Sequence, residues 1–278
     1  MHPVLIQIGD WQLRSYVALI GLAALVSLAY FKTFERRMGL GGRGDFWLLA
    51  NLTAVAGFLG GGLPALLFGS RPVPGVHNLW SLVSSDEGLS TFGVLFGVLA
   101  GVWVYSKLRS ADYLRTLDYV FLVVPLCHGI ARLGCFMAGC CYGRPAHGAV
   151  PWAVVFRDPR AEVPAQLLGL LLHPTQLYEA AGDFSIAALL CLVVLPRVES
   201  GSLRRGTLCF AYFAAYGIVR FINDFFRGSP ETLPGISITA AQALSLGAIL
   251  AAIAFWLIAG RRGHAARVEK VAVPAAAG

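Results

Sequence analysis

The sequence predicts an all-α polytopic membrane protein with seven transmembrane helices, and three observations support this prediction. Hydrophobic residues make up 57% of the 278-residue chain and charged residues only 13%, whereas about 25% of a soluble domain is charged. Seven apolar stretches follow one another, each near the roughly 20 residues that a helix needs to cross the hydrocarbon layer. Lysines and arginines gather in the short connections between them. The net charge of +7 therefore reflects orientation in a membrane, and no nucleic-acid partner is expected.

The predicted helices lie within residues 1–263, which we expect to form a single membrane domain. Their ranges are 15–34, 47–69, 91–107, 118–137, 176–196, 207–222 and 237–260. The segment before the first helix lacks a basic region and a small-residue cleavage site, so no removable signal peptide is expected. Residues 264–278 are rich in alanine and charge, which predicts a disordered cytoplasmic tail.

Two outer connections are long enough to carry structure of their own. The connection 138–175 contains Pro151-Trp-Ala-Val-Val-Phe156, which predicts a short strand or an interfacial segment with Trp152 at the level of the headgroups. The connection 70–90 contains prolines, a histidine and Trp80, and predicts another interfacial stretch.

The distribution of basic residues predicts the orientation of the chain. Fourteen lysines and arginines fall on one side of the predicted membrane and six on the other. The richer side holds Lys32, Arg36, Arg37, Arg43, Lys107, Arg109, Arg115, Arg197, Arg204, Arg205, Arg261, Arg262, Arg267 and Lys270. The other side holds Arg14, Arg71, Arg144, Arg157, Arg160 and Arg227. By the positive-inside rule the richer side is cytoplasmic, which places the N-terminus outside, in the periplasm, and the C-terminus in the cytoplasm.

The fourth predicted helix carries unusual polar residues inside its apolar run. At helical spacing His128, Arg132 and Cys135 share one face. A charge at mid-bilayer depth costs about 2.5–3.5 kcal/mol on insertion scales, so Arg132 should face the protein interior and have an anionic partner. The partner is either a neighbouring carboxylate within a packed bundle or a bound ligand.

The sixth predicted helix carries a matching polar stripe. Tyr216, Arg220, Asp224 and Arg227 follow one another at steps of three or four residues, with Asn223 beside them. One aspartate cannot neutralise this many arginines, so a bound anion such as a lipid phosphate is expected in an outward-opening cavity between the fourth and sixth helices. The alternative is that Asp224 pairs with Arg220 while Arg227 extends to water.

The fifth predicted helix opens with His173-Pro174-Thr175-Gln176-Leu177-Tyr178-Glu179. Pro174 suits a helix start, and capping explains part of this composition. Capping alone does not require the aromatic, amide and carboxylate side chains of Tyr178, Gln176 and Glu179 together at the start of a membrane helix. Asp118, near the start of the fourth helix, is expected to be a cap.

The six cysteines form neither a secreted disulfide framework nor a recognised zinc pattern. Cys135 and Cys140, with Cys141, lie near the predicted outer face, where either a disulfide or a reactive thiol beside the arginines is possible. A metal site built from His128, Cys135 and Cys140 fits no known spacing, so we expect neither a metal nor a cofactor. Three further cysteines are expected to be core residues: Cys127, Cys191 and Cys209.

Three segments together resemble one family. Arg132-Leu-Gly-Cys-Phe-Met-Ala-Gly-Cys-Cys-Tyr-Gly143, His173-Pro-Thr-Gln-Leu-Tyr-Glu-Ala180 and Tyr216-Gly-Ile-Val-Arg-Phe-Ile-Asn-Asp-Phe-Phe-Arg227 resemble prolipoprotein diacylglyceryl transferases, and the similarity extends over about residues 10–260. The resemblance implies a multi-pass enzyme of the bacterial inner (plasma) membrane. Such an enzyme moves diacylglycerol from phosphatidylglycerol, an anionic phospholipid, to the lipobox cysteine in the signal peptide of a prolipoprotein.

The resemblance also assigns roles to residues. It implies that Arg132 and Arg220 hold the phospholipid headgroup, and that Tyr16 matches a tyrosine of the family. It further implies that four residues shape the outer mouth of the site: His173, Gln176, Tyr178 and Glu179. Tyr216 and Arg227 belong to the same expected lipid-binding stripe.

The chain departs from the family at positions that matter for catalysis. Phe92 stands where the family has the histidine proposed as base, and Gly62 stands where it has an arginine. Cys135 and Ala138 replace asparagines, and Cys140 replaces a glutamate.

These departures leave several hypotheses open. Attack by a thiol needs a deprotonated nucleophile and cations that stabilise the departing phosphate. The arginines supply the cations. For the deprotonated nucleophile the candidates are His128, which could take the proton of the thiol, and Cys135 or Cys140, which could act as a nucleophile itself. The alternatives are a transferase with a different acceptor, a lipid or solute transporter, and a non-catalytic lipid-binding protein.

Overall fold

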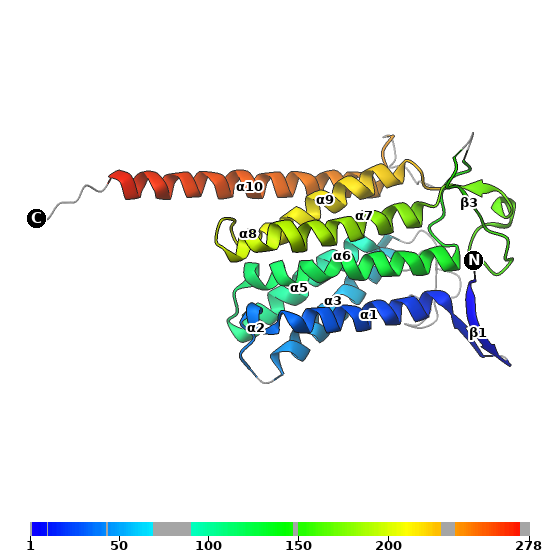
Figure 1. Ribbon diagram of the computed structural model, residues 1–278, viewed down its shortest axis with the longest axis horizontal. Helices are drawn as coiled ribbons and strands as arrows, with labels where there is room; N and C mark the ends of the chain where they lie inside the picture. The colour runs from blue at the N-terminus through cyan, green and yellow to red at the C-terminus, as the bar shows by residue number, and fades with distance from the viewer. Residues whose placement is uncertain are drawn as a thin grey trace, which may run out of the picture.

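The computed structural model describes residues 2–9, 11–42, 44–68, 90–146, 150–228 and 237–272. Long helices occupy all seven predicted stretches and lie side by side in a bundle (Figure 1). They are α1 (Ser15–Thr33), α3 (Asp45–Phe68), α5 (Thr91–Arg109), α6 (Tyr113–Ala138), α7 (Thr175–Leu189), α9 (Thr207–Asp224) and α10 (Ala240–Ala272). The predicted interfacial stretch at 70–90 lies outside the described residues except for Ser90.

Five helices of the described part are long and apolar enough to cross a membrane. They are α1, α5, α6, the run Thr175–Glu199 and the first part of α10 over Ala240–Ile258. The run Thr175–Glu199 is continuous because α7 passes through a π-helical segment, η2 (Leu190–Val194), into α8 (Leu195–Glu199). The protein is thus an all-α membrane protein. α10 continues to Ala272, so it extends into the range 264–278, whose disorder stays a prediction.

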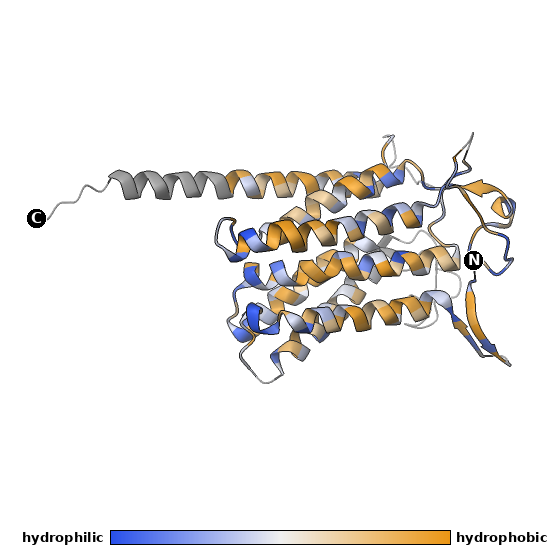
Figure 2. Ribbon diagram, in the orientation of Figure 1, coloured by the Kyte–Doolittle hydropathy of each residue, from blue (hydrophilic) through white to orange (hydrophobic). Residues whose placement is uncertain are grey.

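The two ends of the bundle differ in structure and in polarity. At one end lies the hairpin of β1 (Val4–Ile8) and β2 (Trp11–Arg14), which the sequence did not predict. The pair of β3 (Val154–Val155) and β4 (Leu171–Leu172) lies at the same end (Figure 1). At the other end lie α2 (Glu35–Met38) and α8. Hydrophilic residues gather at the α2 and α8 end, and apolar residues fill the middle of the helices (Figure 2).

The short strand predicted in the outer connection is present. β3 (Val154–Val155) pairs antiparallel with β4 (Leu171–Leu172), and a 3-10 turn, η1 (Ala165–Leu167), lies between them. Phe156, Val163 and Leu172 form a small buried cluster beneath this loop. The outer connection is therefore a folded cap on the bundle, and Trp152 at its edge is exposed.

Glycines bring α3 and α5 into direct backbone contact. Gly93, Gly97 and Gly101 recur every four residues on one face of α5. A Cβ atom at Gly97 would overlap the carbonyl oxygen of Ala56 on α3, and one at Gly101 would lie 2.7 Å from that of Leu52. Small residues at this spacing allow close helix packing in membranes, where dispersion replaces the hydrophobic effect.

Asp118 was expected to cap the fourth helix, α6, but it binds the first amides of α9 instead. Asp112 caps α6, accepting a hydrogen bond from the Arg115 amide at 3.0 Å. Asp118 lies inside α6, buried, and accepts hydrogen bonds from the amides of Gly206, Leu208 and Cys209 at the start of α9. Because the first amides of a helix lack partners of their own, this carboxylate ties α9 to α6.

Candidate active site

Glu179 lies at the point where α6, α7 and α9 meet. Its carboxylate is fully buried. Oε1 lies 2.9 Å from Nη2 of Arg132 and accepts a hydrogen bond from the Tyr216 hydroxyl at 2.9 Å. Oε2 accepts a hydrogen bond from Nδ2 of Asn223 at 3.1 Å. The anionic partner that Arg132 needs is thus a carboxylate of the neighbouring helix, and the sequence had placed Glu179 at the mouth instead.

A second buried pair extends this network. Nδ1 of His128 lies 2.8 Å from Oδ2 of Asp183 on α7, and its Nε2 lies 4.0 Å from Oε1 of Glu179. The imidazole also packs edge-on against the ring of Tyr216. Asp183 is thus a buried carboxylate at ion-pair distance from the imidazole, and it is a functional candidate that the sequence alone did not indicate.

The arginine stripe of α9 is largely satisfied within the protein. Nη1 of Arg220 lies 2.7 Å from Oδ1 of Asp224 one turn later. The Thr239 hydroxyl, just before α10, donates to the other oxygen of Asp224. Of the two alternatives for Arg220, the structure has the internal ion pair. Arg220 and Arg227 also lie within electrostatic range of Glu179, so the positive charges of α9 act on the buried carboxylate as well.

A cavity lies beside α6 in the described part of the chain. It has a volume of about 650 Å³ and runs between α1, α5 and α6 beneath the β1–β2 hairpin. Of α9, only Tyr212 contributes to its wall, so this cavity is not the one expected between the fourth and sixth helices, which stays a prediction. Because membrane helices are apolar on most faces, the sequence does not indicate which helices are neighbours.

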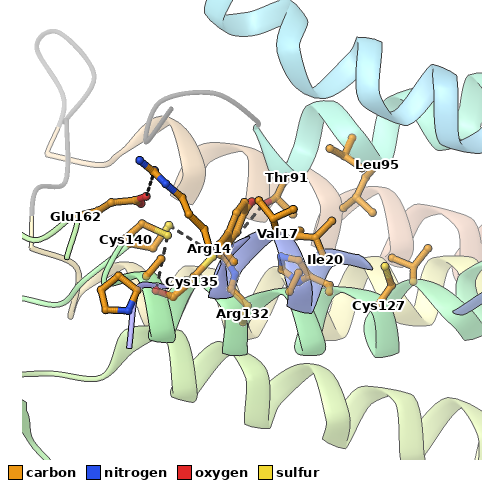
Figure 3. Close-up of a pocket in the computed structure, with 18 of the residues that line it drawn as sticks. Arg14, Val17, Ile20, Thr91, Leu95, Cys127, Arg132, Cys135, Cys140 and Glu162 are labelled. Atoms are coloured by element: carbon orange, nitrogen blue, oxygen red, sulfur yellow. Dashed lines mark hydrogen bonds and ion pairs between the residues drawn. The ribbon is translucent and has the colours of Figure 1, made fainter. Parts of the chain in front are cut away.

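The cavity combines apolar walls with a cationic interior (Figure 3). Val17, Ile20 and Leu95 are among the side chains along its walls, and Arg132 and His128 face it from α6. Nη1 of Arg132 lies 3.4 Å from the Cys141 sulfur, and Nε has no hydrogen-bond partner among the described residues. The guanidinium of Arg132 thus pairs with Glu179 on one side and faces the cavity on the other.

Two further arginines line the cavity at the outer end. Arg14 from β2 lies 3.7 Å from the carboxylate of Glu162, and Arg160 pairs with Asp158. The hydrogen bonds from Arg160 lower the pKa of the Asp158 carboxyl to about 2. In the sequence Arg14 and Arg160 stand out only as basic residues of the outer connections, because contacts between a terminal hairpin and a distant loop leave no local pattern.

Tyr16 is one of the aromatic residues at the cavity, whereas Phe92 is buried away from it. Tyr16 lines the cavity and packs against the cluster of Cys135 and Cys140. Phe92 is buried, with its ring centroid 6.0 Å from that of Tyr216. Phe92 therefore packs against the aromatic ring of Tyr216 and is not among the residues that line the cavity.

The residues expected at the mouth hold the outer connection in place. Nε2 of Gln176 donates to the Cys140 carbonyl at 2.7 Å, and the Thr175 hydroxyl donates to the Cys141 carbonyl at 2.7 Å. The Tyr178 hydroxyl accepts a hydrogen bond from the indole of Trp152 at 2.7 Å and lies 3.1 Å from Nδ1 of His173. None of these side chains is among the residues that line the cavity.

His173 itself lies outside the helices, against the ring of Phe226. Partial burial, together with the neighbouring Arg144, lowers the pKa of the His173 imidazole. Its role in the structure is therefore that of a neutral residue that joins the outer connection to α7.

All six cysteines are free thiols. The sulfurs of Cys135, Cys140 and Cys141 lie within 4.8 Å of one another, whereas His128 is not part of this group. Cys209 is buried in the core as expected. Cys191 lies 2.9 Å from the Tyr30 hydroxyl, and Cys127 lines the cavity at the end opposite Cys140 (Figure 3).

A bundle of apolar helices and a largely apolar cavity that Arg132 faces define an integral membrane protein with a cavity between its helices. Residues 3–258 match the family described as prolipoprotein diacylglyceryl transferase. The chain belongs to this family of transferases.

Curated relatives support this assignment over nearly the whole chain. A protein of Clostridium tetani is 29% identical over 91% of this chain and 96% of its own. Proteins of Rhodospirillum centenum and Methylocella silvestris are each 32% identical, over 93% and 94% of this chain and 91% and 95% of their own. All three are named phosphatidylglycerol–prolipoprotein diacylglyceryl transferase.

Proposed function

We propose that this protein transfers diacylglycerol from phosphatidylglycerol to the thiol of a lipobox cysteine at the outer face of the bacterial plasma membrane. The observation that carries the proposal is Arg132, whose guanidinium faces an apolar cavity of about 650 Å³ and is held in place by Glu179. Guanidinium groups bind phosphates through two parallel hydrogen bonds. The apolar walls offer the acyl chains a surface that resembles the lipid phase.

The seven-helix topology is part of the proposal. We place the N-terminus and both hairpins outside and the end with α2 and α8 in the cytoplasm. The arrangement of helix ends in Figure 1 supports this, because the basic connections at 32–37, 107–115 and 197–205 lie at the α2 and α8 end. The β1–β2 hairpin and the outer connection then meet the lipoprotein substrate.

The chemistry follows from the groups around the cavity. The substrate sulfur attacks the terminal glycerol carbon of the diacylglycerol unit, and a carbon–sulfur bond replaces the bond between that carbon and the phosphate oxygen. The electron pair of the broken bond leaves with the phosphate as glycerol phosphate, and Arg132 stabilises the developing charge. His128, held by Asp183 on the cavity wall, is positioned to accept the thiol proton.

Arg220 has an indirect part in this proposal. Its pair with Asp224 anchors α9, and its charge, with that of Arg227, raises the positive potential around Glu179. The resemblance implies that Arg220 contacts the phospholipid headgroup. We assign this contact to Arg132 instead, together with Arg14 and Arg160 at the outer end of the cavity.

The proposal is tested with purified protein, phosphatidylglycerol vesicles and a synthetic lipobox peptide. We expect the peptide mass to increase by one diacylglycerol unit, and a peptide with serine in place of its cysteine to remain unchanged. Modification of a different thiol or amine, with the lipobox peptide untouched, would indicate a transferase with another acceptor. Lipid movement between vesicles without any covalent product would indicate a transporter and overturn the proposal.

A further inference from the structure

Three thiols converge where α6 ends, and the turn that follows the helix is the cause. α6 stops at Ala138, and Gly139 adopts a left-handed conformation with a φ of 87°. This reversal folds Cys140 and Cys141 back toward Cys135 in the last turn of the helix. The three sulfurs consequently lie within 4.8 Å of one another although the residues are five and six positions apart.

The spacing suits a single metal ion. Zinc binds thiolate sulfur at about 2.3 Å, so sulfurs that share one tetrahedral ion lie about 3.8 Å apart. The observed limit of 4.8 Å exceeds this separation by about 1 Å, which small side-chain rotations can close. A donor set of three sulfurs favours soft and borderline ions such as zinc over magnesium or calcium.

The surroundings supply charge and rigidity for such a site. Three thiolates and one divalent ion carry a net charge of about −1. Nη1 of Arg132 lies 3.4 Å from the Cys141 sulfur, and Arg227 is also within electrostatic range of it. Gln176 and Thr175 fix the carbonyl groups of Cys140 and Cys141, and hydrogen bonds of this kind around ligand residues orient a metal site.

The cluster also faces the place where chemistry is proposed. All three cysteines line the cavity, and Figure 3 shows Cys135 and Cys140 together at the end near Arg14 and Glu162. Catalytic zinc sites keep three protein ligands and leave a fourth position open for water or substrate. Here the open position would face the cavity, which the acceptor thiol must enter.

We propose that Cys135, Cys140 and Cys141 bind one zinc-class ion through three thiolates, and that its fourth position takes the thiol of the acceptor cysteine. This inference rests on the proposed transferase function. A thiol that coordinates zinc loses its proton, so the ion supplies the activated nucleophile in a chain where Phe92 fills the position of the family histidine.

The reaction balances without any further reagent. Coordination releases the proton of the acceptor thiol to His128 and from there to water. The metal-bound sulfur then forms its bond to the glycerol carbon, and the bond from that carbon to the phosphate oxygen breaks. The products are a thioether, which is a weaker ligand and leaves the metal, and glycerol phosphate, which leaves with the electron pair. No group is oxidised or reduced.

The site is tested first by metal binding alone, without lipid or peptide. We expect full-length protein in detergent, purified under reducing conditions without a metal-affinity step, to bind one Zn²⁺ per chain. Replacement by Co²⁺ should give a sulfur-to-cobalt charge-transfer band. Each of Cys135→Ser, Cys140→Ser and Cys141→Ser should weaken Zn²⁺ binding by at least about tenfold. Cys127→Ser, at the opposite end of the same cavity, should bind as the parent does.

Other results would overturn the metal site. A protein with six titratable thiols and no bound Zn²⁺ or Co²⁺ would contradict it, as would four thiols and a disulfide among Cys135, Cys140 and Cys141. The proposed function is judged separately. Peptide lipidation that survives removal of the metal would refute only the metal proposal, and stoichiometric metal binding without lipidation would refute only the transferase.

Discussion

Arg132 makes contacts on two sides of α6, and this dual position explains why its helix carries so many polar residues. The sequence predicted that an arginine at this depth needs an anion, but it could not select Glu179, because that choice depends on α7 lying beside α6. The sequence left two hypotheses open for Arg220, and the structure has the pair with Asp224. The cysteine cluster was not predictable from spacing, since it depends on the turn at Gly139.

The first prediction concerns Glu179. Glu179→Gln should lower the free energy of unfolding by about 3–5 kcal/mol, because it leaves the buried Arg132 without a counter-charge. Thermal unfolding in detergent measures this. The matched control is Glu162→Gln, which alters an ion pair at the partly exposed end of the cavity and should cost at most about 1 kcal/mol. Equal effects of the two variants would contradict the central place given to Glu179.

The second prediction concerns the ion pair on α9. Arg220→Ala should destabilise the fold, because Asp224 is 3% exposed and would become a buried uncompensated charge. Asp224→Ala added to Arg220→Ala should recover part of the loss. Melting temperatures of the two single variants and the double variant give the coupling. Strictly additive losses would show that the two side chains do not depend on each other.

At the scale of elements, the length of the apolar stretches made the helices predictable from the sequence. The predicted helices agree with the structure to within a few residues at most boundaries, because a stretch long enough to cross a bilayer has no alternative to a helix. The β1–β2 hairpin was missed, since strands of five and four residues lack length as a signal. The expectation that Asp118 caps the fourth helix was wrong, because Asp112 caps α6 and Asp118 binds the first amides of α9.

The third prediction tests the contact between α3 and α5. Gly97→Ala should destabilise the protein by about 1–3 kcal/mol, because the added methyl group overlaps the Ala56 carbonyl and forces the helices apart. Gly21→Ala on α1 meets nothing within 4 Å and should leave stability unchanged or raise it by up to about 1 kcal/mol. Thermal unfolding of both variants under the same detergent conditions distinguishes them. A tolerated Gly97→Ala would indicate a looser contact than the structure has.

At the scale of the whole molecule, the sequence predicted a bundle of apolar helices, five of which in the described part are long and apolar enough to cross a membrane, but not which helices lie next to one another. Charge in the connections indicates orientation, whereas helices that are apolar on most faces carry little information on their neighbours. The cavity described here lies between α1, α5 and α6, whereas the one that the arginine pattern suggests between α6 and α9 stays a prediction.

The fourth prediction concerns topology. Reporters fused after Arg115 or Arg205 should be cytoplasmic, and a reporter inserted in the outer connection near Arg160 should be external, because basic residues of short connections are retained inside. Paired fusions to an enzyme active only outside and a fluorophore active only inside measure this. A cytoplasmic signal from the outer connection would invert the arrangement and place the cavity mouth on the wrong side for a secreted acceptor.

The central claim is that the cavity beneath Arg132 brings a phospholipid and a thiol together for transfer, and its two products test this most directly. Glycerol phosphate and lipidated peptide should appear in equal amounts when both are followed in one reaction by mass spectrometry. Val17→Trp, which fills the cavity from α1 without altering the Glu179 network, should lower both yields together while the melting temperature is retained. Unchanged yields in a folded Val17→Trp variant, or glycerol phosphate released without lipidated peptide, would contradict the claim.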